Sequence, residues 1–180
     1  MKKTIVLMIA LIMAVSVVSG CGKKQEEPAG QLSEEPIANM VNPVVQSNPD
    51  EIMQKFGIQF TVPENAKDVV YQIVGDEFAE MRYTEDGTKF VARIMPAAEF
   101  TDIGGYYVDW TAEESGKVGY NDAVLKSYVN KDGDDVQLIM WFDIVPGVMY
   151  SLSAEAPDLN GIDMEVHAMQ VYVPMQGNAG

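Results

Sequence analysis

One cysteine and one histidine limit the covalent and metal chemistry open to this chain. Cys21 and His167 are each the only residue of their type among 180 residues. A Ser-His-acid triad would have to use His167, which falls in a predicted helix between Val166 and Ala168. A histidine-based zinc site would need more nitrogen or sulfur ligands than the sequence supplies. We therefore interpret His167 as a packed or surface imidazole, and we expect no catalytic residue and no metal site.

Clustered carboxylates are the second feature that could bind a ligand, in this case calcium. Asp132, Asp134 and Asp135 follow one another closely, and calcium binds oxygen ligands. Their spacing does not match an EF-hand loop, and no bidentate glutamate follows at the twelfth position. We interpret the cluster as a plain hairpin turn. The sequence also contains neither a glycine-rich phosphate loop nor a Gly-x-Ser-x-Gly elbow, so we expect no cofactor.

A glycine pair followed by aromatic residues is the best candidate for a binding surface. Gly104 and Gly105 precede Tyr106, Tyr107 and Trp110. Adjacent glycines indicate either a sharp turn or a close approach by a partner, since glycine loses the most backbone freedom on folding. Aromatic side chains provide a large contact area. We predict that these five residues form an interaction surface, and the alternative is that the aromatic residues belong to the core beside the start of a strand.

The N-terminal segment predicts export from the cytoplasm. Lys2 and Lys3 precede an apolar run from Ile5 to Val18, which is the pattern of a secretory signal. The run is shorter than the about 20 residues that a membrane-spanning helix needs. We therefore predict a signal peptide over residues 1–20.

The residues that end this signal carry a resemblance to a known motif. Val18-Ser19-Gly20-Cys21 resembles the bacterial lipobox, in which an aliphatic residue and two small ones precede an obligatory cysteine. The resemblance implies that the Cys21 thiol receives a diacylglycerol and becomes the lipid-carrying N-terminus, with acyl chains such as palmitate. The expected location is the outer, extracytoplasmic face of the plasma membrane, with the lipid as the contact to the membrane. Because no second cysteine exists, the domain must fold without disulfides.

The acidic composition excludes one class of partner. Loss of Lys2 and Lys3 leaves ten basic and 27 acidic residues, a net charge of −17. Such a surface repels phosphate backbones, so we expect no nucleic-acid partner. Residues 21–47 comprise the cysteine expected to carry the lipid and a segment that is rich in charged residues, proline and glycine. This segment shows no apolar period, which predicts a flexible tether. Apolar residues within it, among them Val44 and Val45, leave open whether the tether docks on the domain.

Residues 48–174 are predicted to form a single domain, followed by a disordered tail over residues 175–180. A short N-terminal helix is expected from Pro49 to Phe56, because an asparagine cap, a proline and two acidic residues mark its start. A C-terminal helix is expected near residues 162–173, where apolar residues recur at helical spacing. The residues of this apolar stripe are Ile162, Val166, Met169 and Val173.

Between the two helices, apolar residues alternate with polar ones at the period of a β-strand. A first block starts with a strand from Ile58 to Thr61 and contains a hairpin at Asp86-Gly87, a dipeptide that favours tight turns. A second block repeats this plan around a turn over residues 130–134. Its return strand, over residues 136–142, is apolar on both faces and is therefore predicted to be central.

The last strand and the order of the elements complete the fold prediction. In this strand Val148, Tyr150, Leu152 and Ala154 are expected to face the core, and Ser151 and Ser153 to face water. Runs of strands flanked by helices predict an α+β fold. The expected antiparallel sheet is built from two hairpin-rich blocks, with the C-terminal helix packed on it.

Three segments of the domain carry a further resemblance. They are residues 56–63, Met81-Arg82-Tyr83 with its Asp86-Gly87 turn, and the Asp-Ile-Gly-Gly-Tyr stretch that ends at Tyr106. They resemble uncharacterised lipoproteins of Gram-positive bacteria that carry a conserved domain of unknown function, also found beside anti-sigma-factor-like proteins. The similarity covers roughly residues 48–173. It implies a β-rich extracytoplasmic domain and assigns no activity.

These observations predict a non-catalytic binding or interaction module for an unknown protein or small-molecule ligand. The alternative is a carrier of a lipid or other apolar molecule in a cavity between the sheet and its covering helix. A hydrolase is the third class. A filled core favours interaction, an apolar cavity of several hundred Å³ favours carriage, and a cleft with two facing carboxylates favours hydrolysis.

Overall fold

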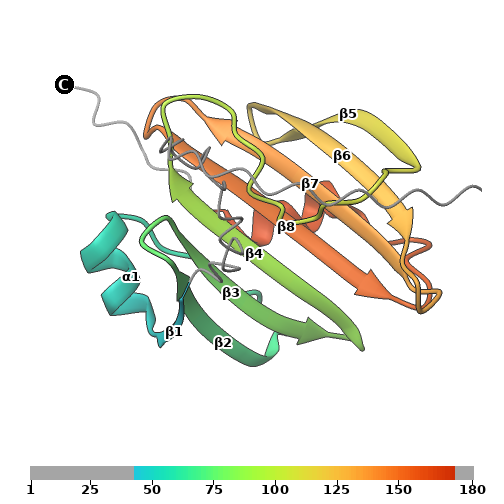
Figure 1. Cartoon of the computed structure of the whole chain (residues 1–180), viewed down its shortest axis with the longest axis horizontal. Helices are drawn as coiled ribbons and strands as arrows, with labels where there is room; N and C mark the ends of the chain where they lie inside the picture. Colours follow the sequence, from blue (N-terminus) through green and yellow to red (C-terminus); the bar gives the residue numbers. More distant parts are fainter. Residues whose placement is uncertain (1–42, 173–180) are drawn as a thin grey trace, which may run out of the picture. The chain divides into compact units, whose positions relative to one another are not determined.

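The computed structural model describes residues 43–172. The predicted signal peptide, the predicted lipidation site Cys21, the predicted tether as far as residue 42 and the predicted tail over residues 175–180 lie outside the described residues. The described region is β-rich, with eight antiparallel strands in one sheet and two helices of eight residues each (Figure 1). Neither of these two helices is long and apolar enough to cross a membrane.

The strands form two four-stranded meanders that meet where β4 pairs with β8. The first meander contains β1 (Val44–Ser47), β2 (Lys67–Val74), β3 (Phe78–Glu85) and β4 (Thr88–Pro96). The second contains β5 (Ala112–Val118), β6 (Asn121–Val129), β7 (Asp135–Asp143) and β8 (Val148–Ala156). The order in the sheet is β1-β2-β3-β4-β8-β7-β6-β5. The predicted antiparallel sheet is thereby confirmed.

The turn between β3 and β4 follows the chemistry of its residues. Asp86 and Gly87 have φ angles of 48° and 86°, the left-handed conformation that a two-residue hairpin turn with matching strand twist requires. The register then places Tyr83 opposite Phe90 and Glu80 opposite Arg93. The hairpin predicted at this position is confirmed.

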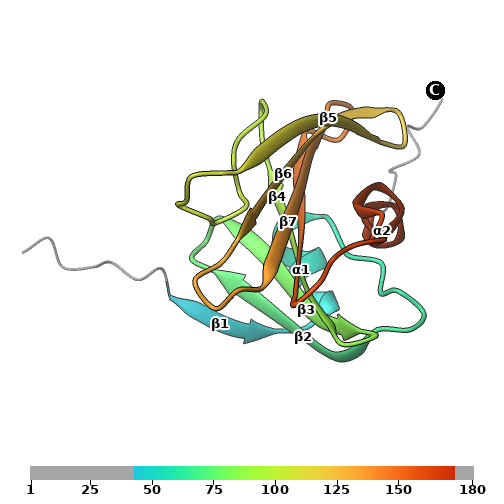
Figure 2. The same ribbon diagram turned by 90° about the vertical axis from the view of Figure 1, so that its right-hand side faces the viewer.

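Both helices contribute to the core on one face of the sheet. The first helix, α1 (Pro49–Phe56), begins at Asn48, whose side chain accepts a hydrogen bond from Glu51 N. The second, α2 (Met164–Val171), begins at Asp163, which caps two backbone N–H groups in the same way. Ile52 of α1 and three residues of α2 are buried against the sheet around Trp141 and Tyr150. Figure 2 shows α2 on one side of the sheet.

The apolar stripe predicted for the C-terminal helix is only partly correct. Ile162 packs against the core, and Val173 lies outside the described residues. Val166 and Met169 are 54% and 44% exposed, whereas Met164, Ala168 and Val171 are buried. Both sets of residues recur at helical spacing, and α2 carries apolar residues all round. The period therefore could not decide which face meets the sheet.

Helix α2 also protects the edge strand β5. Glu165 Oε1 accepts a hydrogen bond from Lys117 N at 2.9 Å, and so satisfies a backbone donor of a strand that has a neighbour on one side only. Gly116 makes this approach possible, because a Cβ there would overlap Leu125 Cδ1 and Glu165 Oε1. An unprotected edge strand would invite pairing with other chains.

Two further segments differ from the sequence predictions. Residues 58–61 form no strand; Ile58 is buried, but Thr61 N donates to Val171 O at the end of α2 rather than to a neighbouring strand. Residues 44–47, within the range predicted as tether, form β1, in which Val44 pairs with Val74 of β2. The sheet therefore begins before the predicted domain start at residue 48.

The face of the sheet opposite the helices is covered by the loop between β4 and β5, residues 97–111 (Figure 2). Ile103 of this loop is buried against Leu138, Met140 and Met149. The other face of β7 is buried too, as Ile139 and Trp141 show. The prediction that this strand is covered on both faces is confirmed.

The prediction that Ser151 and Ser153 face water is wrong. They are only 2% and 4% exposed. The strand that carries them, β8, lies between β4 and β7 in the middle of the sheet, where Arg93 and Met140 are the register partners of Ser151. Polar–apolar alternation predicted a solvated face, but small hydroxyl residues can occupy a covered one.

Candidate functional site

The five residues predicted as an interaction surface all lie in the β4–β5 loop, but the structure brings only some of them together. Tyr106 and Trp110 are half-buried, with their ring centroids 5.7 Å apart. Gly104 is buried and Gly105 is exposed. Tyr107 is 100% exposed. Because the segment is a loop and no strand, β-strand alternation does not decide which side chains face the sheet.

Arg93 of β4 fastens this loop to the sheet. Its Nη1 donates hydrogen bonds to Ile103 O at 3.0 Å and Gly104 O at 2.5 Å. Its Nε donates to Glu80 Oε2 at 2.7 Å, while Arg82 Nε donates to Glu80 Oε1 at 2.6 Å. Glu80 is only 1% exposed, so these two guanidinium groups compensate a buried carboxylate.

The two glycines allow the loop backbone to lie directly on the sheet. A Cβ at Gly104 would be 2.5 Å from Leu138 Cδ2. Gly105 has a φ of +76°, and a Cβ there would overlap Arg93 Nη1. The glycine pair therefore permits close packing of the loop, and Gly105 adopts a positive φ. This packing is different from the approach by a partner that the sequence suggested. The surface approached by the backbone is the protein's own sheet.

An aromatic cluster stands beside this attachment. Tyr128 of β6, which no sequence pattern marked as a site residue, has its ring 6.1 Å from that of Tyr106 and 5.3 Å from that of Trp110. Lys126 Nζ lies 5.8 Å from the centre of the Trp110 ring, within the range of a cation–π contact. Burial raises the pKa of the Tyr128 hydroxyl, and the nearby Tyr106 and Glu155 raise it further.

Two hollows border Tyr106 on the surface of this face. One, of about 450 Å³, is lined by Phe78, Arg93 and Met95 together with residues of the loop, including Tyr107. The other, of about 340 Å³, extends over the exposed part of β3, β4 and β8. Its lining combines cationic, anionic, apolar and hydroxyl side chains: Arg82, Lys89, Glu155, Val91, Ser153 and Thr84.

This mixture can bind a ligand that has both polar and apolar parts. Arg82 and Lys89 keep 55% and 68% of their side chains exposed, so both cations are accessible from solvent. Tyr106 lines both hollows and provides an aromatic wall between them. The hollows together with Tyr106 and Tyr107 are named the loop-face groove below.

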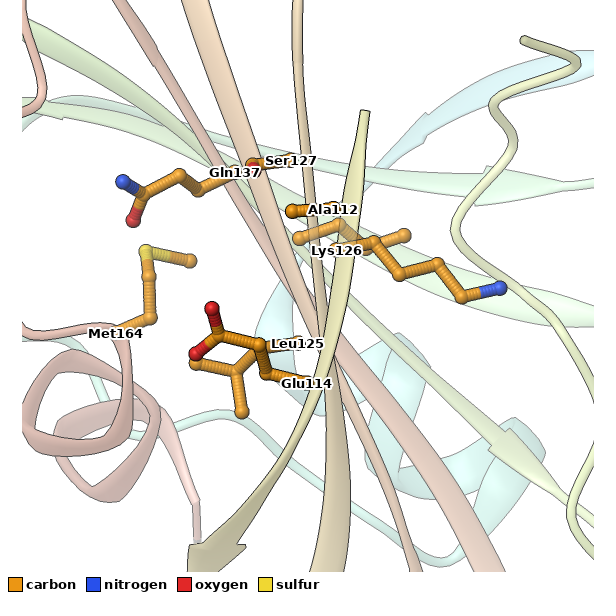
Figure 3. Close-up of a pocket in the computed structure, with 8 residues that line it drawn as sticks. Ala112, Glu114, Leu125, Lys126, Ser127, Gln137 and Met164 are labelled. Atoms are coloured by element: carbon orange, nitrogen blue, oxygen red, sulfur yellow. The ribbon is translucent and has the colours of Figure 1, made fainter. Parts of the chain in front are cut away.

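A third hollow lies between α2 and the strands β5, β6 and β7 (Figure 3). Met164 and the Glu114 carboxylate turn into it, beside Leu125 and Gln137, whereas Lys126 points away on the other side of the sheet. Its volume is about 150 Å³. Pockets for drug-sized ligands have about 300–1,000 Å³, so this hollow is too small for an acyl chain.

His167 packs against an aromatic ring of the core. Its imidazole stacks on Phe90 at 4.9 Å, and its Nδ1 lies 3.7 Å from Glu85 Oε2. Neither of these two atoms has a hydrogen-bond partner within residues 43–172. Within the described region these contacts with Phe90 and Glu85 do not resemble a nucleophile–base pair.

The carboxylates considered for calcium form a hairpin turn. Asn130 Oδ1 accepts hydrogen bonds from Asp132 N and Asp134 N, both at 2.9 Å. Asp135 Oδ2 accepts from Leu159 N at 3.2 Å. Over the part of the chain that the structure describes, no group of three or more histidine, cysteine or acidic side chains is placed to hold a metal ion.

Comparison of the chain with protein-family models, with curated proteins and with solved structures found no match.

Proposed function

We propose that this chain is a membrane-anchored lipoprotein whose extracytoplasmic domain is a non-catalytic binding module. The proposed anchor is a lipid on Cys21, supported by the lipobox-like residues 18–21 after an apolar run. The proposed location is the outer face of the plasma membrane. We assign the domain to the α+β class, with both helices packed on one face of the sheet.

The loop-face groove is the proposed binding site. The observation that carries this proposal is the contrast within one loop between a fixed backbone and an exposed side chain. Arg93 holds the carbonyls of Ile103 and Gly104, yet Tyr107 is fully exposed a few residues later. A binding residue presented by a rigid backbone loses little conformational entropy when a partner binds, and tyrosine is among the residues enriched at binding hot spots.

Carriage of a lipid is less well supported. The core between helices and sheet is filled by large side chains, including Trp141, Tyr150 and Phe90, each at most 1% exposed. The hollow beside α2 has only about 150 Å³. The polar and charged lining of the loop-face groove fits a protein segment or a polar small molecule better than an acyl chain.

Site-specific photo-crosslinking in the producing cell tests the binding module. A photoreactive phenylalanine analogue would replace Tyr107, and in a matched control it would replace Val129, which is 60% exposed and lies outside the groove. We expect one discrete adduct from position 107 that is absent from position 129 and is weakened by Tyr106→Ala. Identical adduct patterns from both positions would contradict the assignment of this groove.

Metabolic labelling with a palmitate analogue tests the anchor independently. We expect the wild-type chain to carry label and to sediment with membranes, and Cys21→Ala to lose both properties. Serine at position 21 serves as a second variant, because it preserves the size of the side chain but lacks the thiol. Labelling that persists in both variants would show that the anchor is elsewhere.

A further inference from the structure

One end of the sheet gathers the most exposed large apolar side chains of the described region. Four such side chains are 75% or more exposed: Tyr107, Tyr120, Ile144 and Val145. The last three lie in the β5–β6 and β7–β8 turns, which are neighbours because β6 pairs with β7. Phe100, 45% exposed, follows β4 at the same end. Phe100, Tyr120, Ile144 and Val145 are named the apolar end.

Hydrogen bonds beneath the surface hold these turns in place. Asp143 Oδ1 accepts from Val145 N at 3.2 Å, and Asp143 Oδ2 accepts from the Tyr172 hydroxyl. Asn121 Nδ2, next to Tyr120, donates to the Tyr172 hydroxyl at 3.4 Å. The network joins both turns through a carboxylate that is 7% exposed. The apolar side chains are therefore displayed by fixed backbone.

The chain enters the domain at this same end. Gly75 N, in the β2–β3 turn, donates to Pro43 O at 2.9 Å, and Val44 pairs with the last residue of β2. Since β2, β4, β5 and β7 run in the same direction through the antiparallel sheet (Figure 1), the β2–β3, β5–β6 and β7–β8 turns share one end. Only 21 residues separate Cys21 from Pro43, and a coil of that length spans about 25 Å.

The two ends of the sheet also differ in their charged residues. The turns at the opposite end of the sheet carry a concentration of acidic residues: Glu64, Asp86, Asp132, Asp134 and Asp158. At the apolar end, Asp76 and Asp122 are each paired with a lysine, Lys55 and Lys117 respectively, and Glu77 and Glu99 are exposed at the same end. An anionic membrane surface would repel the acidic end, whereas tyrosine and aliphatic side chains suit the interface of a bilayer.

We propose that the apolar end docks on the bilayer that anchors Cys21, with Tyr120, Ile144 and Val145 inserted at the level of the headgroups. The inference rests on the proposed lipidation of Cys21. It adds that the domain is held in one orientation, with the acidic end turned away from the membrane. A protein partner at the apolar end is the competing explanation.

The full-length lipidated chain in phosphatidylcholine vesicles provides the test. Acylation of Cys21 leaves no free thiol, so Ile144→Cys creates the single site for a polarity-sensitive fluorophore. Val129→Cys at the opposite end, where the native side chain is 60% exposed, is the matched control. We expect the label at 144 to be quenched several-fold more by a nitroxide on the lipid chains than the label at 129, and several-fold less by aqueous iodide.

The possible outcomes separate this inference from the proposed function. If the protein floats with vesicles but both labels respond equally to iodide, docking is wrong and the anchor stands. If the thiol of Cys21 itself reacts with the fluorophore and the protein does not float, both proposals fail. If the label at 144 is shielded in native membranes but open to iodide in pure lipid, the apolar end binds a protein and the proposal is overturned.

Val145→Asp in the Ile144→Cys background should abolish the shielding while leaving flotation unchanged.

Discussion

Arg93 and Glu80 face each other on neighbouring strands and together connect the sheet to the loop of the candidate site. They are register partners in β4 and β3, joined by an ion pair of 2.7 Å. The same Arg93 side chain binds two carbonyls of the β4–β5 loop. The position of Tyr106 and Tyr107 thus depends on a buried carboxylate that lies two strands from the middle of the sheet.

Arg93→Met should therefore destabilise the domain and release the loop. Breaking a buried ion pair typically costs about 3–5 kcal/mol, and we expect about 2–4 kcal/mol here because Arg82 still contacts Glu80. Urea unfolding gives the free energy, and limited proteolysis within residues 97–111 reports the loop. Lys89→Met removes an exposed pair with Glu155 and should cost about 0–1 kcal/mol. Equal losses in the two variants would show that Arg93 is no anchor.

Gly105→Ala and Gly133→Ala form a matched pair for the close packing of the loop. Both glycines have positive φ, +76° and +89°, but only at Gly105 would a Cβ meet another group, the guanidinium of Arg93. Alanine should cost each variant about 1 kcal/mol for the left-handed backbone. Gly105→Ala should lose about 1–3 kcal/mol more for overpacking, measured by thermal or urea unfolding. A difference near zero would mean that Arg93 moves aside freely.

Local signals predicted much of the sheet. The Asp86-Gly87 dipeptide marked a hairpin that forms as expected, and two-sided apolarity identified β7 as a covered strand. Predictions failed where the outcome depends on residues that are distant in the sequence. Ser151 is buried because its strand lies in the middle of the sheet with neighbours on both sides. The helical period could not distinguish the exposed face of α2 from its buried face, because both faces have the same period.

The candidate site was only half predictable for a similar reason. The composition of residues 104–110 predicted an interaction surface. In the structure, this loop covers one face of the sheet. Nothing local indicated that Glu80 and Arg93, 13 residues apart, would meet beneath it, or that Tyr128 would join the aromatic cluster. Such contacts are set by strand register, which a single sequence shows only weakly.

Tyr106→Ala and Tyr107→Ala should differ sharply in stability. Tyr106 packs against Trp110 and Tyr128, so its truncation should cost about 1–3 kcal/mol, less than the about 3–5 kcal/mol of a fully buried aromatic residue. Tyr107 is 100% exposed, and its truncation should stay within about 0.5 kcal/mol of wild type. Urea unfolding provides both values. Core-sized losses in both variants would make the segment structural and remove it as a candidate binding surface.

Tyr172 should make the domain sensitive to alkaline pH. Burial, followed by the hydrogen bond to Asp143, raises the pKa of its hydroxyl from 10.0 to about 12. The folded state thus keeps a proton that the unfolded chain releases near pH 10. Stability from this group is complete below pH 10 and should decrease as the pH rises from 10 to about 12. Burial raises the pKa of Tyr83 and Tyr150 as well. The free energy of unfolding of the wild type should therefore decrease steeply in this range.

Tyr172→Phe isolates the contribution of this hydroxyl. At pH 8 the variant should be about 1–3 kcal/mol less stable, because Asp143 loses a buried hydrogen-bond donor. Between pH 10 and 12 its stability should decrease less steeply than that of wild type, since one of the tyrosines with a raised pKa is gone. Tyr120→Phe, at a side chain that is 102% exposed, is the control and should follow the wild-type curve. Urea unfolding at pH 8, 10, 11 and 12 measures both effects, and parallel curves for Tyr172→Phe and wild type would exclude Tyr172 as a source of the alkaline sensitivity.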